Sequence, residues 1–308
     1  IVAFRGDNRY EARGTLAADG TGWSISLDAG FDRAARDEVL ALWPIAVERK
    51  ARSWVADHID GGDVTAGTLA FRKAPKGKLK MNGTFGIEGA TIRPLKGLAP
   101  LDIAQGYVSL VPSRVVVVAE AASMTAPEGT ALDLSGSSYL IPAGRQPDKV
   151  GTLNLQLAGP IPGVLSVLAD EPFAVFARTD GDLGPDMARG AAVAEGRILI
   201  PLRPGKLKPN DIAYDISAQL TGVRSDVLIE NKLLLGDALE LHASNTGIEV
   251  TGPVQIGQAR AQGTWMMPMV NGVSLPATIS GTMEITPAAL SEFGLEDVAA
   301  MVSGSTRG

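Results

Sequence analysis

The chain has 308 residues, of which 45% are apolar and 20% charged, and its formal net charge is −6 at pH 7. This length is sufficient for one large domain or two ordinary domains. The absence of cysteine excludes disulfides and thiolate metal sites. The acidic balance argues against nucleic-acid binding and against adhesion to anionic lipid through a polybasic patch. The one basic run, at residues 72–80, is interpreted as a solvated turn.

The N-terminal part of the chain predicts a helical hairpin over residues 32–60. Its first helix spans residues 32–42 and ends at Trp43-Pro44, because proline breaks a helix. Its second helix spans residues 46–60, with apolar residues at helical spacing, and stops at Gly61-Gly62. The two tryptophans of this segment, Trp43 and Trp54, are expected to anchor the hairpin onto a sheet.

Strict alternation of apolar and polar residues is the strongest pattern along the chain, and it predicts strands with one apolar and one wet face. Short turns rich in Gly, Asn and Asp separate these runs, which is typical of antiparallel hairpins. The apolar members, which we expect to line a groove, are Trp23, Ile25, Leu27, Leu79, Met81, Phe85, Ile87, Leu153, Leu155, Leu157, Tyr214, Ile216, Leu220, Leu239, Leu241, Ile279, Met283 and Ile285.

The sequence therefore predicts a mainly β fold, α+β by strict count, with a long curved antiparallel sheet. A short helix is predicted at 162–169, and a C-terminal helix at 287–302 begins after the capping residue Thr286. A turn-rich segment at 141–148 divides the chain into two modules, 1–141 and 142–308, which we expect to share one continuous sheet.

No catalytic, cofactor or metal motif is complete. His58 and His242 are the only histidines, and we interpret both as surface or packing residues. The neighbouring acids Asp37 and Glu38, or Glu296 and Asp297, offer an acid–base pair for sugar chemistry, but such pairs usually mark the wet face of a helix. We therefore predict a non-enzyme without a cofactor, and keep a carbohydrate-active enzyme as the third hypothesis.

One segment resembles a known family. The residues Trp43, Pro44, Arg52, Trp54 and Gly61-Gly62 are similar to the signature of AsmA-like proteins of the YhdP type. The resemblance implies a repeating β-groove in the bacterial periplasm that passes phospholipid between the inner and outer membranes. It also implies an inner-membrane anchor, which we expect upstream because the chain begins without Met and has no bilayer-spanning apolar run.

Two non-enzymatic hypotheses follow. In the first, the apolar faces shelter phospholipid acyl chains, whose transfer from water is worth about 0.8 kcal/mol per methylene. In the second, the chain is a structural envelope protein whose apolar faces pack fully against protein and bind no lipid. No nucleic-acid partner is predicted in either case.

Overall fold

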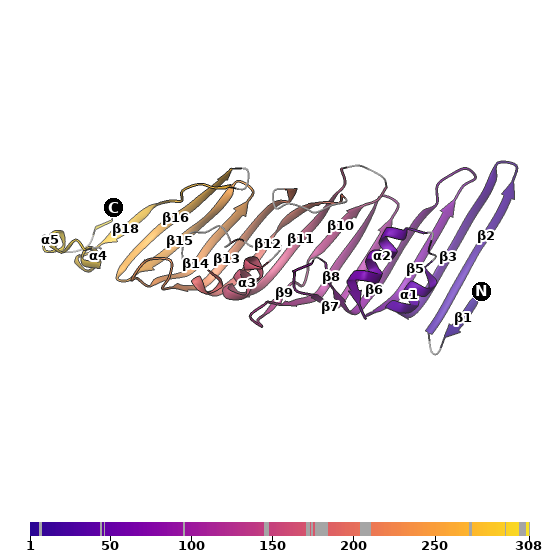
Figure 1. Cartoon of the computed structure of the whole chain (residues 1–308), viewed down its shortest axis with the longest axis horizontal. Coiled ribbons are helices and arrows are strands. Elements are labelled where there is room, and N and C mark those ends of the chain that lie inside the picture. The colour runs from indigo at the N-terminus through magenta and orange to yellow at the C-terminus, as the bar shows by residue number, and fades with distance from the viewer. Residues whose placement is uncertain are drawn as a thin grey trace. The chain divides into compact units, whose positions relative to one another are not determined.

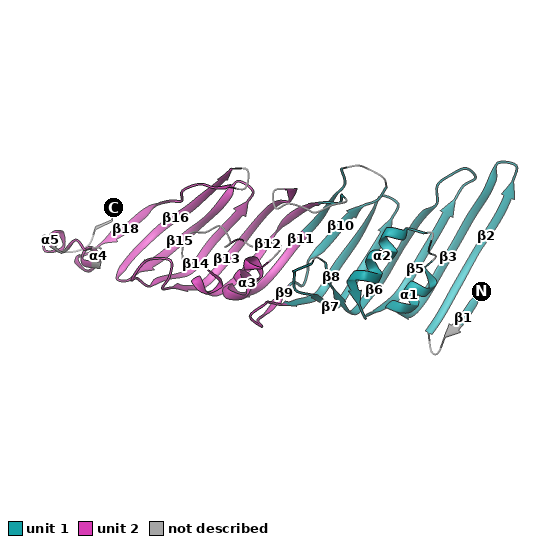
Figure 2. Ribbon diagram, viewed as in Figure 1, with its two compact units in different colours: residues 1–124, 134–153, 201–204 teal, residues 125–133, 154–200, 205–308 magenta. Residues whose placement is uncertain are grey.

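The computed structural model describes residues 1–5, 8–43, 45, 47–94, 96–144, 148–170, 173, 175, 184–203, 211–270, 273–292, 294–301 and 306–307. The fold is mainly β and antiparallel, with 62% of the residues in strands and few short helices (Figure 1). This confirms the predicted fold class. The chain divides into two compact units (Figure 2). Unit 1 comprises residues 1–124, 134–153 and 201–204, and unit 2 comprises residues 125–133, 154–200 and 205–308.

In unit 1 the strands pair in the order β1-β2-β3-β5-β6-β7-β8-β10, with β4 beside β6. Each pairing is antiparallel, as expected for strands joined by short turns. The strands are β1 (Val2–Arg5), β2 (Asn8–Asp19), β3 (Gly22–Ala35), β4 (Ile59–Asp60), β5 (Asp63–Lys73), β6 (Lys80–Ile92), β7 (Leu101–Val111), β8 (Arg114–Thr125) and β10 (Ser138–Pro142). Strand β11 (Val150–Pro160) contributes residues to both units.

In unit 2 the order is β12-β13-β14-β15-β16-β18, and the short strands β17 and β19 pair with β16 and β18. These strands are β12 (Arg189–Pro201), β13 (Ala213–Ser225), β14 (Leu234–Ser244), β15 (Gly247–Ile256), β16 (Ala259–Val270), β17 (Val273–Ser274), β18 (Thr278–Ile285) and β19 (Thr306–Arg307). Strand β9 (Ala131–Asp133) meets β11 at one residue pair.

The helical hairpin is shorter than predicted. Helix α1 (Arg36–Leu42) begins four residues late, because residues 32–35 continue β3 and residues 33–35 pair with β5. Helix α2 (Arg49–His58) ends where β4 begins. Pro44 lies outside the described residues.

The remaining helices are α3 (Ile161–Ala169), the 3₁₀ turn η1 (Pro185–Met187), α4 (Pro287–Glu292) and α5 (Glu296–Ala299). Helix α3 matches the short helix predicted at 162–169. Thr286 caps α4 as predicted, because its Oγ1 accepts a hydrogen bond from the backbone N–H of Ala289 (3.1 Å). The single predicted C-terminal helix is wrong, since Gly294 (φ +73°) lies in the turn between α4 and α5.

β-Bulges interrupt several ladders and change which residues face the core. In β7, Ala104 and Gln105 are consecutive exposed residues, and the register to β8 shifts there. Ile103, before the bulge, therefore points to the same side as Gly106 and Val108, after it. Similar shifts occur between β5 and β6, β12 and β13, and β14 and β15.

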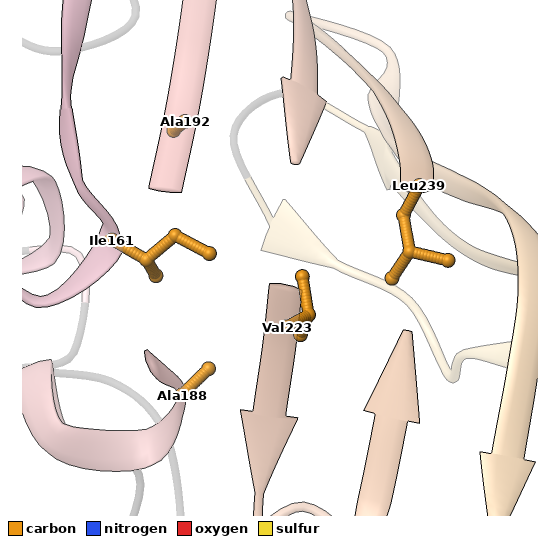
Figure 3. Packing of buried hydrophobic residues seen from close by; sticks show 5 residues of the cluster. All are labelled: Ile161, Ala188, Ala192, Val223 and Leu239. Atoms are coloured by element: carbon orange, nitrogen blue, oxygen red, sulfur yellow. The ribbon is translucent and has the colours of Figure 1, made fainter. Parts of the chain in front are cut away.

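Each unit has a small buried cluster close to its bulges. In unit 1 the buried residues are Ile103, Ala119 and Ala122. In unit 2, Ile161 of α3 packs with Ala188, Ala192, Val223 and Leu239 (Figure 3). These clusters stabilise one end of the strands, and they contain few large side chains.

Candidate functional site

The residues predicted to line a groove in unit 1 lie on one face of its sheet. Residues directly opposite each other on antiparallel strands share a face. The register pairs Ile25 with Leu16, Leu27 with Phe71, and Phe71 with Met81. Farther along, Phe85 faces Val108 and Ile87 faces Gly106. The apolar face of unit 1 therefore runs without interruption from β2 to β8.

Unit 2 has an equivalent apolar face. Ile216 pairs with Ala243, and Leu220 pairs with Leu239. On the following strands, Val250 of β15 pairs with Trp265 of β16, and Trp265 pairs with Ile279 of β18. The predicted residues on this face are Leu155, Leu157, Tyr214, Ile216, Leu220, Leu239, Leu241, Ile279, Met283 and Ile285. Leu153 belongs to the same alternating run of β11 but falls within unit 1.

Much of each apolar face is open. Ile279 is 81% exposed, Trp23 54% and Leu79 46%, which is unusual for side chains of this size. Most of the other predicted residues are half-buried. Leu239 differs, because it is only 6% exposed and belongs to the packed cluster under α3. Leu239 is therefore not accessible to a ligand, although the sequence predicted it to line the groove.

Helices cover only one end of each face. In unit 2, α3 places Ile161 against Val223 and Leu239 (Figure 3). In unit 1, α1 lies close to the apolar face, since the hydroxyl of Tyr10 donates to the Glu38 carboxylate (3.3 Å) and the Tyr10 ring stacks on Phe31. Figure 1 shows α1 and α2 in front of β5 and β6, and α3 in front of the strands of unit 2. Away from these helices, no second layer covers the strands among the described residues.

The surface area agrees with this arrangement. The chain exposes 19072 Å² to solvent. A compact protein of the same length is expected to expose about 12,000 Å². Burial still raises the pKa of the Tyr139 and Tyr214 phenols, so the faces provide a partly desolvated environment. Sheet faces that no second protein layer covers contribute to this larger area.

The corner between α1 and α2 contains the described signature residues. The Arg52 guanidinium donates to the carbonyls of Leu40 (3.0 Å) and Trp43 (3.3 Å), which joins the two helices. The Trp43 indole donates to the Val47 carbonyl (2.8 Å). Trp54 stacks on His58 and is 41% exposed. Contrary to the prediction, it therefore does not anchor the hairpin to the sheet.

Gly61 and Gly62 have φ of +62° and +82°, as the sharp turn into β5 requires. A Cβ on Gly62 would come within 2.7 Å of Ala90 Cβ. Both glycines of the signature therefore have a conformational role, and the second also permits close packing.

The candidate acids of α1 and the histidine of β14 have partners in the described part of the chain. Glu38 caps α1 by accepting from the backbone N–H of Ala35 (3.2 Å), and Asp37 pairs with Arg36. His242 lies 3.7 Å from Asp215 on the polar face of unit 2. Within the ranges that the structure describes, no three acidic or histidine side chains are grouped to hold a metal ion.

Comparison with known proteins does not extend this description. No family model, no curated protein and no solved structure matches the chain. Among the described residues, no helix combines the length and apolarity needed to cross a bilayer. The two open apolar faces are therefore the most distinctive surface feature of the described chain.

Proposed function

We propose that the chain is a non-enzymatic lipid-transfer module whose open apolar faces shelter the acyl chains of phospholipids. The observation that carries the proposal is the exposure of large apolar side chains in a continuous register across many strands. Contiguous exposed apolar surface in a folded protein usually marks a binding site. Acyl chains fit this surface because it is long, aliphatic and poor in hydrogen-bonding groups.

The energetics favour a ligand of this kind. Two acyl chains carry about 30 methylenes, each worth roughly 0.8 kcal/mol on complete removal from water. An open face shields only part of each methylene, but adjacent strands add surface every ~4.8 Å. A long apolar chain lying across the strands therefore gains more than a compact ligand would.

The cellular role follows from the resemblance of the Trp43–Arg52–Trp54 segment to AsmA-like proteins. We propose that the module acts in the periplasm and supports lipid movement between inner and outer membranes as part of an anchored protein. The alternative is a structural envelope protein that binds no lipid. It is favoured by the packed clusters under the helices, such as Ile161 with Leu239.

The test is lipid analysis of protein purified from cells, by native mass spectrometry and by extraction. We expect co-purified phospholipid in the wild type and a several-fold loss in Ile279→Glu, because a carboxylate on the open face disfavours an acyl chain. Ser280→Glu is the matched control, since this residue is exposed and neighbours Ile279 in β18. Lipid-free wild-type protein, or equal lipid in the two variants, would contradict the proposal.

A further inference from the structure

The turn between β5 and β6 is strongly basic in an otherwise acidic chain. Residues 72–80 contain Lys73, Lys76, Lys78 and Lys80 and no acidic residue, whereas the whole chain carries −6. Arg72 in the same segment is neutralised by Asp28 at 2.6 Å. Lys76 and Lys78 are exposed. The turn is therefore a local concentration of positive charge, and the acidic net charge, which argued against adhesion to anionic lipid, does not describe this edge of unit 1.

This turn lies beside three large apolar residues of unit 1 that are exposed to solvent. Leu16 is 64% exposed, Trp23 54% and Leu79 46%. Leu16 faces Ile25 across β2 and β3, and Ile25 faces Lys73 across β3 and β5. The combination places large apolar side chains and ammonium groups on one edge of unit 1.

One hydrogen bond joins the two hairpins of this edge, and their backbones lie close together. The Nζ of Lys73 donates to the Trp23 carbonyl (3.4 Å). A Cβ built on Gly22 in the β2–β3 hairpin would lie 3.6 Å from the backbone nitrogen of Lys76. In Figure 1 the β2–β3 and β5–β6 turns lie at the same ends of their strands. The carboxylate of Asp19 in the first turn accepts hydrogen bonds from Thr21 and Gly22.

We propose that this basic edge, formed by the β2–β3 and β5–β6 turns, docks on the surface of an anionic lipid bilayer. Tryptophan and leucine favour the boundary between headgroups and acyl chains. Lysine side chains bury their methylenes there and keep their ammonium groups among the phosphates. A soluble polyanion would account for the lysines but would leave Leu16, Trp23 and Leu79 exposed to water.

Docking on a bilayer goes beyond the proposed function, because it uses the lysines of the β5–β6 turn, which acyl-chain binding does not need. Lys76 and Lys78 lie in the turn outside the strands, and neither lies on the apolar face. Their replacement therefore leaves the lipid content of purified protein unchanged while membrane binding falls. The lipid content of the purified protein therefore tests acyl-chain binding, and vesicle binding tests docking on a bilayer, so the failure of one proposal can be distinguished from the failure of the other.

The first experiment is flotation of the purified chain with phosphatidylcholine vesicles, with and without phosphatidylglycerol. We expect binding only to the anionic vesicles, and weakening by added salt. Lys76→Gln with Lys78→Gln should weaken binding about 30-fold, from the typical contribution of a basic residue near an anionic membrane. Arg49→Gln with Lys50→Gln on α2 is the matched control, because it removes the same charge from exposed positions elsewhere in unit 1.

The second experiment keeps the proposal testable if the lysine variant fails to fold. Vesicles with brominated acyl chains should quench tryptophan fluorescence of the wild type, and Trp23→Phe should remove most of that quenching. Equal binding to neutral vesicles, an equal loss in both double variants, or quenching retained in Trp23→Phe would overturn the proposal. Absence of binding to either vesicle would overturn it as well.

Discussion

Ala66 holds a left-handed backbone conformation, with φ of +47°, at the register shift between Thr65 and Thr68. For a residue with a Cβ this conformation costs about 1 kcal/mol or more. Ala66 is exposed, so its methyl group contributes little packing. We expect Ala66→Gly to raise the free energy of unfolding by about 0.5–1 kcal/mol, because relief of strain exceeds the added entropy of the unfolded chain. Urea denaturation measures the change.

Gly89 provides the opposite substitution at a similar backbone conformation. Its φ is +64°, and a Cβ built on it would meet no atom within 4 Å. Gly89→Ala therefore adds backbone strain without a clash, and should lower the free energy of unfolding by about 1 kcal/mol. If Ala66→Gly were destabilising too, the left-handed conformation of Ala66 would not be a source of strain.

At the scale of single elements, one carboxylate joins α3 to the turn that precedes β9. Ser166 of α3 is buried and donates a hydrogen bond to Glu128, and also to the carbonyl of Gly163 (2.9 Å). Partial desolvation raises the pKa of Glu128, but hydrogen bonds from Ser166, Thr130 and its own backbone N–H outweigh it. The pKa of Glu128 is therefore held below its ordinary value of 4.5.

This lowered pKa predicts how the attachment of α3 depends on pH. A group with a lowered pKa in the folded state stabilises above its unfolded-state pKa, and the effect is lost as the pH falls through the folded-state value. We expect Glu128→Gln to lower the thermal midpoint at neutral pH, with the difference from wild type beginning to shrink near pH 4.5 and disappearing as the pH falls through the lower folded-state pKa. Melting curves across this range, with Glu120→Gln as an exposed carboxylate control, measure it. A pH-independent difference would contradict the assignment.

Alternation was sufficient to predict individual strands but not how each strand bends. Strands β13 and β18 follow the alternating runs around Ile216 and Ile279 closely. Bulges such as that at Ala104 add one residue, so alternation alone assigns the residues beyond them to the wrong face. The sequence also could not show that α3 covers Leu239, since this contact joins residues far apart in the chain. The shorter α1 has the same origin, because pairing with β5 keeps residues 33–35 in β3.

For the molecule as a whole, open apolar faces imply an unusual balance of forces. A chain that leaves more surface in water than a compact protein of its length gains less from the hydrophobic effect on folding. The extensive antiparallel ladders within each unit satisfy backbone groups and supply cross-strand packing instead. The free protein therefore depends more on its ladders than on a large core, and a bound lipid would supply part of the missing burial.

The heat capacity of unfolding measures this missing burial directly. A compact protein of 308 residues is expected to show about 4 kcal/mol/K. The 19072 Å² exposed by the folded chain leaves roughly a fifth less surface to be exposed on unfolding, so calorimetry of lipid-free protein should give a value lower by about that fraction. Heat capacities add over the two units, so the test does not require them to unfold together. Lipid-loaded protein should recover part of the difference and unfold at a higher temperature, because a ligand of the folded state stabilises it. A lipid-free value equal to that of a compact protein would show instead that the apolar faces pack against each other in solution.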